Sequence, residues 1–129
     1  MSIAEFKQLV VDELEAKGVT IYAGGIRKQE PPYVQLYPAE DFIEVVNTSI
    51  GTNEYNIRVR FDLTIIAGPE DRDMSFDYLS ELVKKCMDVV RNLDDVSCKA
   101  RVFIDANGGR NLGANIAFSN ELNINEGDL

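Results

Sequence analysis

Residues 54–65 read EYNIRVRFDLTI, in which large apolar side chains alternate with polar or charged ones. Successive side chains of a β-strand point to opposite faces, so this stretch predicts a strand with one apolar and one polar face. The apolar face consists of Tyr55, Ile57, Val59, Phe61, Leu63 and Ile65. The opposite face presents Arg58, Arg60 and Asp62, and we expect it to meet water or a partner.

Shorter strands are predicted before this one, at Val19–Tyr22, Tyr33–Tyr37 and Phe42–Val46. Pro38 is expected to close the second of them, because proline lacks a backbone donor. Gly51, Thr52 and Asn53 then supply a turn. We therefore predict an antiparallel hairpin that joins residues 42–50 to residues 54–66.

The first helix is predicted over Ser2–Lys17. Ser2 and Glu5 have the spacing of a capping box, and Gly18 provides a stop. Apolar residues at helical spacing form its expected buried stripe: Ile3, Phe6, Leu9, Val10 and Leu14.

A second, longer helix is predicted from about Met74 to Leu93, with Asp73 or Ser75 as its cap. The charged run Gly68–Asp73 before it is expected to be a solvated loop. The apolar stripe of this helix comprises Phe76, Leu79, Leu82, Val83, Cys86, Val89, Val90 and Leu93.

Two alternating strands close the chain, at Val96–Asp105 and Leu112–Ser119, joined by a turn at Asn107–Gly109. The inward face of the first strand is expected to carry Val96, Cys98, Ala100, Val102 and Ile104. Gly108–Gly113 superficially resembles a phosphate-binding loop. It joins two strands rather than a strand and a helix, so a hairpin turn is the favoured interpretation.

These elements predict an α+β fold, with one mostly antiparallel sheet and both helices packed on one face. The 129 residues fit a single domain spanning 1–129, with a flexible C-terminal tail from about residue 123. A net charge of -9 argues against binding nucleic acid through phosphate neutralisation. No apolar run is long enough to cross a bilayer, and Met1–Lys17 lacks the pattern of a signal peptide, so we expect synthesis in a cytosol.

The sequence offers little for catalysis. Histidine is absent, which removes the usual proton shuttle near neutral pH and the commonest transition-metal ligand. Acids cluster at Glu40–Asp41, in the Glu70–Asp73 stretch and at Asp94–Asp95, where we interpret them as solvated turn residues. We expect neither a metal nor a cofactor. A small carboxylate-dependent enzyme stays open as an alternative.

Cys86 and Cys98 both fall on predicted inward faces and are expected to be neighbouring, buried and reduced thiols, since the chain has no export signal. A disulfide or redox pair is the alternative interpretation.

Three surface segments are the predicted interface candidates. The first is the polar strand face with Arg58, Arg60 and Asp62, because arginine forks pair well with carboxylates across a contact. An ordinary solvated sheet surface is the alternative reading of this face. The other two segments contribute Glu70, Asp71 and Arg72 from the charged loop, and Thr52 and Asn53 from the hairpin tip.

The capped first helix, the strand from Tyr55 to Ile65 with its charged loop, the helix from Phe76 to Leu93 and the closing hairpin together resemble the tail terminator and neck proteins of long-tailed bacteriophages. The likeness lies in the order and character of elements over most of residues 2–122. It contains no short diagnostic motif, and it is weakest over residues 24–53.

The resemblance implies a noncatalytic structural protein that forms a ring, typically of six copies. Such a ring caps the tail tube, stops its polymerisation and offers a surface for head joining. The implied partners are the tail tube protein and a head-completion or connector protein, and the implied location is the virion tail or neck, after assembly in the host cytoplasm. Another head-tail connector or a generic oligomeric adaptor is the alternative that shares this layout.

Overall fold

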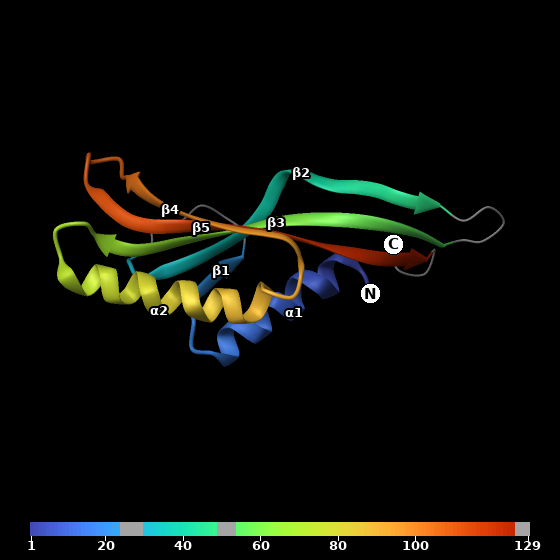
Figure 1. Cartoon of the computed structure of the whole chain (residues 1–129), viewed down its shortest axis with the longest axis horizontal. Coiled ribbons are helices and arrows are strands. Elements are labelled where there is room, and N and C mark those ends of the chain that lie inside the picture. The colour runs from blue at the N-terminus through green and yellow to red at the C-terminus, as the bar shows by residue number, and fades with distance from the viewer. Residues whose placement is uncertain (24–29, 49–53, 126–129) are drawn as a thin grey trace.

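The computed structural model describes residues 1–23, 30–48 and 54–125, and within them it forms one five-stranded sheet with two helices. The elements, in chain order, are α1 (Ile3–Ala16), β1 (Ile21–Ala23), β2 (Tyr33–Thr48), β3 (Glu54–Pro69), α2 (Asp73–Val90), β4 (Asp94–Ile104) and β5 (Arg110–Asn125). The strands lie in the order β1-β2-β3-β5-β4, and every neighbouring pair is antiparallel except β1 with β2. Both helices lie on one side of the sheet (Figure 1). This confirms the predicted α+β class.

The central strand β3 carries the core, as its alternation predicts. Its apolar side chains point toward the helices, and Val59, Leu63 and Ile65 are fully buried. Phe61 stacks on Phe118 of β5, with ring centroids 6.0 Å apart, and Phe6 of α1 closes on both rings. Each such buried side chain contributes about 1.5–3 kcal/mol of transfer free energy. The sheet and both helices therefore share one core.

The first helix begins and ends where the sequence indicates. The Ser2 hydroxyl accepts from the amide of Glu5, and the Glu5 carboxylate accepts from the amide of Ser2, so the capping box is confirmed. Gly18 follows the helix with φ +79°, a conformation that suits glycine. The predicted stripe is wrong at Leu9, which is 42% exposed, whereas Val11 is buried. Leu9 and Val11 lie on opposite borders of the apolar stripe, and the rest of the molecule covers only the border with Val11.

The second helix starts one residue earlier than predicted and ends at Val90. Neither proposed cap is correct, because Arg72 occupies the N-cap position without a side-chain bond. Ser75 is instead buried against the end of β3, where a Cβ on Gly68 would lie 2.7 Å from its hydroxyl oxygen. The prediction that Phe76 belongs to the buried stripe is also wrong, since 54% of this residue is exposed.

The two strands predicted at Tyr33–Tyr37 and Phe42–Val46 are one strand, β2, with a bulge between Pro38 and Ile43. Strand β1 pairs with β2 only as far as Leu36, so the irregular part of β2 is a sheet edge. Proline and bulges are tolerated there because no neighbour needs the missing donor. The predicted hairpin with β3 is confirmed, and its turn at Gly51–Asn53 lies outside the described residues.

The last two strands form the predicted hairpin, in which the Asp105 carboxylate accepts from the amides of Asn107 and Gly109. The hairpin confirms that Gly108–Gly113 does not open a helix. Strand β5 continues to Asn125, so the tail expected from about residue 123 is strand at its start.

The inward side of β4 faces the helix side of the sheet, as predicted, but it is not buried. Val102 is 42% exposed and Ile104 is 67% exposed. The reason is the position of the strand: among the described strands β4 pairs only with β5, and α2 packs mainly against β3 and β5.

Candidate interaction surface

The side of the sheet that carries no helix is largely polar, and it holds the predicted strand face. Arg58, Arg60 and Asp62 of β3 all point to this side, and each is half-buried. Thr64 continues the row, where it is buried and bonded to Tyr37 and Asn115. The alternation of β3 is therefore confirmed on both faces, although the side chains of the polar face are less exposed to solvent than expected.

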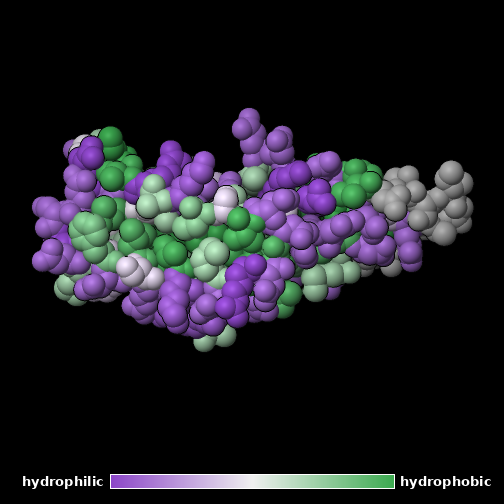
Figure 2. Space-filling model, viewed as in Figure 1, coloured by the Kyte–Doolittle hydropathy of each residue, from purple (hydrophilic) through white to green (hydrophobic). Residues whose placement is uncertain are grey.

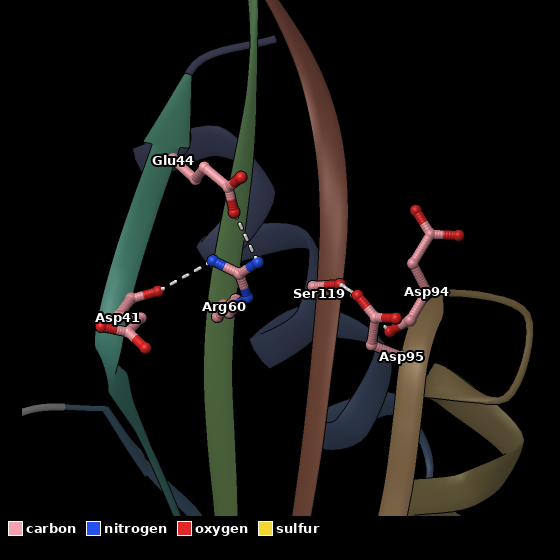
Figure 3. A network of polar contacts seen from close by, with 6 residues as sticks. All are labelled: Asp41, Glu44, Arg60, Asp94, Asp95 and Ser119. Atoms are coloured by element: carbon pink, nitrogen blue, oxygen red, sulfur yellow. Dashed lines mark hydrogen bonds and ion pairs between the residues drawn. The ribbon is translucent and has the colours of Figure 1, made fainter. Parts of the chain in front are cut away.

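Arg60 is held within its own chain. Its Nη2 donates to the Glu44 carboxylate at 2.7 Å and its Nη1 donates to the carbonyl of Asp41 at 3.3 Å (Figure 3). The hydrogen bond and charge of Arg60 lower the pKa of Glu44, and the same bond raises the pKa of Arg60. This ion pair joins β3 to the part of β2 that follows the bulge, from Ile43 onward, which we call the distal half of β2. Arg60 is thus less available to a partner than the sequence indicates.

A second polar contact lies beside Arg60. Ser119 of β5 is the register partner of both Arg60 and Asp94, and it is buried. Its hydroxyl donates to the Asp95 carboxylate at 2.8 Å and lies 3.3 Å from the Asp94 carbonyl oxygen (Figure 3). Asp95 has φ +51°, and the β4 register shifts between Asp94 and Ser97. Sequence reasoning treated these two acids as a solvated turn and missed this role.

Arg58 differs from Arg60 in having an unsatisfied donor. Its Nε is buried and has no hydrogen-bond partner within the described part of the chain. Its register partners are Glu44 and Glu121, and its charge helps to lower the pKa of Glu44. Of the two predicted arginines, Arg58 is the one with bonding capacity to spare.

The charged loop after β3 lies elsewhere. Arg110 Nε donates to the Glu70 carboxylate at 2.6 Å, and the Glu70 amide donates to the Arg110 carbonyl, so this loop is tied to the β4–β5 turn. Asp71 and Arg72 are exposed.

The polar strand face and the charged loop are therefore not brought into one patch. Nine residues of β3 lie between Arg60 and Glu70, which places them roughly 30 Å apart at the usual rise per residue. Thr52 and Asn53, the remaining candidates, lie outside the described residues.

A hollow of about 600 Å³ lies where β2 starts and β3 ends, lined in part by Tyr33, Tyr78, Arg72 and Asp105. Burial, with a smaller effect of Tyr22, raises the pKa of Tyr33. The Asp105 carboxylate already accepts two backbone amides of its own turn. Across residues 1–23, 30–48 and 54–125, no three Cys, Asp or Glu side chains are grouped so that they could hold a metal.

The two cysteines are free thiols in different environments. Cys86 of α2 is buried, and that burial, with a smaller effect of Cys98, raises its pKa to about 12. Their electrostatic interaction is consistent with the predicted proximity. The prediction that Cys98 is buried is wrong, because β4 lies at the sheet edge and leaves this thiol exposed.

Comparison with models of known protein families gives no match, and comparison with curated protein sequences gives none either. Among the described residues, neither helix is long and apolar enough to span a membrane.

Proposed function

We propose that this chain is a structural assembly protein of the tail terminator kind, which forms a ring on the end of a phage tail tube. In that role it stops tube polymerisation and provides the surface for head joining. The proposal rests on the resemblance in element order and on one observation above all. The described sheet ends in edges that are long, exposed and partly apolar.

The edge of β4 is the clearest case. Eleven residues, Asp94–Ile104, pair on one side with β5 and on the other side with nothing in the described chain. An open edge of this length presents unpaired backbone donors and acceptors, and large exposed apolar side chains add to its tendency to associate. A protein that works by assembling has a use for such an edge.

The shape supports the same role. Strands β2, β3 and β5 continue past both helices, so they project at one end of the molecule (Figure 1), although the apolar Ile57, Leu122 and Ile124 there are buried. A projecting ribbon can reach a neighbouring subunit or the rim of a tube. The acidic net charge of -9 suits a ring through which DNA passes without adhering, since like charges repel.

Native mass spectrometry over a range of protein concentrations and ionic strengths, with electron microscopy of the protein mixed with isolated tail tubes, tests the proposal. A closed oligomer and density confined to tube ends are expected. A closed oligomer that ignores tube ends would favour a different connector or adaptor. A chain that stays monomeric in solution and on tubes would overturn the proposal.

A further inference from the structure

Two exposed apolar patches lie on sheet edges at opposite ends of the molecule. The β4 edge patch consists of Val102 and Ile104, which are 42% and 67% exposed. The β2 edge patch consists of Ile43 and Val45, which are 49% and 57% exposed. Hydrophobic side chains gather over the ends of β4 and β2, at the upper left and upper right of Figure 2.

Both patches belong to the same face of the sheet. Ile43 and Val45 pair with Val59 and Ile57, which point toward the helices. Val102 pairs with Leu112, on the side of β5 that also carries the buried Ile116. If the two edges met, their apolar side chains would lie on a common face, as in one continuous sheet.

Nothing in the described part of the chain covers either patch. Strand β1 stops opposite Leu36, well before Ile43, and α2 packs against β3 and β5. Because the patches lie at opposite ends of the long axis, one copy cannot bring its own two edges together. A second copy can.

The charges midway along β4 and those of β2 around its bulge have opposite signs. Strand β4 presents Lys99 and Arg101, which make no ion pair with an acid in the described residues; Arg101 lies over the Phe103 ring at 5.6 Å. Strand β2 presents exposed Glu40 and Asp41 in its bulge and Glu44 just beyond it.

This difference in sign selects the pairing. Two β4 edges paired through their patches would place Lys99 and Arg101 of both copies close together, and two β2 edges would place negative charges together. The acids Asp95 and Asp105, near the ends of β4, already have contacts within the chain, because Asp95 accepts from Ser119 and Asp105 accepts from amides of its own turn. Pairing of unlike edges instead brings charges of opposite sign together. Charged residues and bulges at a sheet edge can also serve to prevent strand pairing. That role alone would not explain why large apolar side chains are exposed beside them.

We propose that the β4 edge of one copy docks on the distal β2 edge of a second copy. The β4 edge patch then packs against the β2 edge patch, while Lys99 and Arg101 approach Glu40, Asp41 and Glu44. The inference rests on the proposed ring and specifies its subunit contact. A contact between two different edges is head-to-tail, so it leaves one edge of each kind free until a ring closes.

Cross-linking tests the pairing directly, because Cys98 is the exposed native thiol on β4. Unaltered chain, which supplies Cys98, is mixed with C98S/V45C chain and treated with a short bis-maleimide. We expect a cross-linked heterodimer. The matched control is C98S/S80C, which moves the second thiol to an exposed position on α2 and is expected to give little of that product.

Charge reversal gives an independent measurement. K99E/R101E chain and E40K/D41K chain should each lose the oligomer mass seen for the unaltered chain. A 1:1 mixture should regain it, because each reversed edge then meets a complementary one. Circular dichroism of each variant checks that the fold persists, and the cross-link does not depend on these variants.

The outcomes separate the two proposals. An unaltered chain that forms a ring, with no heterodimer cross-link above the control and no effect of charge reversal, would overturn this contact and leave the ring standing. An unaltered chain that never oligomerises, in solution or on tail tubes, would overturn both.

Discussion

Strands β3 and β4 have similar alternating sequences and opposite surroundings. The helix-facing side chains of β3 from Ile57 to Ile65 are at most 3% exposed, whereas Val102 and Ile104 of β4 are 42% and 67% exposed. Strand β3 lies between β2 and β5 above the helices, and β4 lies at the edge beyond them. Alternation therefore identifies a strand and its two faces, but the place of the strand in the sheet decides whether the apolar face is buried.

The largest difference between the strands should appear in stability, and two isoleucines provide a matched pair. Ile65 of β3 is 0% exposed and Ile104 of β4 is 67% exposed. Ile65→Ala leaves a cavity in the core, so the free energy of unfolding should fall by about 2–5 kcal/mol. Ile104→Ala removes atoms that already contact water, so the change should stay within about 0.5 kcal/mol.

Urea unfolding followed by circular dichroism measures both values, at a concentration where the chain is monomeric. Equal losses for the two variants would contradict the contrast between a buried and an open strand. A loss for Ile104→Ala that appears only at assembling concentrations would instead show that a partner covers the β4 edge patch.

Thiol labelling compares the open strand β4 with the buried side of α2, and it does so without changing stability. Cys98 on β4 is exposed, while Cys86 is buried and its pKa is raised to about 12, so almost none of it is thiolate near neutral pH. We expect Ellman's reagent to modify Cys98 well before Cys86 in the native monomer, and both thiols in denaturant. The C98S variant is the control and should react only on unfolding. Equal native rates for the two thiols would show that α2 does not pack as described.

Much of the fold could be predicted from the sequence, because periodicity and local caps act over a few residues. The Ser2 capping box, the alternation of β3 and the turn at Asn107–Gly109 are examples, and all three are confirmed. The bulge in β2 could not be predicted in the same way. Pro38 indicates a strand end locally, and only the short length of β1 makes an irregular edge acceptable there.

The candidate surface was predicted less completely, because its contacts join distant parts of the chain. The polar face of β3 could be read from alternation alone. The pairing of Arg60 with Glu44 depends on the register that follows the β2 bulge, and the bond from Ser119 to Asp95 depends on a shift in β4. No pattern within either segment specifies these registers.

The smallest expected effect concerns how the two strands use their positive charges. Arg60 of β3 bonds to Glu44 and lowers its pKa, whereas Lys99 of β4 has no such partner in the described chain. In the monomer, Arg60→Gln should raise the pKa of Glu44 toward its ordinary value, and Lys99→Gln should leave it unchanged. Carbon-detected NMR titration of the Glu44 carboxyl group measures both.

The sign of the pH effect on stability follows from the lowered pKa. Ionised Glu44 is favoured in the folded chain, so its contribution is present above the pKa of the unfolded state and is lost as the pH falls through the lowered folded value. Arg60→Gln should flatten this part of the stability profile only slightly, because solvent screens this partly exposed ion pair. If Glu44 titrates identically in the unaltered chain and in Arg60→Gln, the pair does not hold β2 on β3. If Lys99→Gln shifts the pKa of Glu44 only in the oligomer, Lys99 of one copy lies close to the β2 edge of a neighbouring copy.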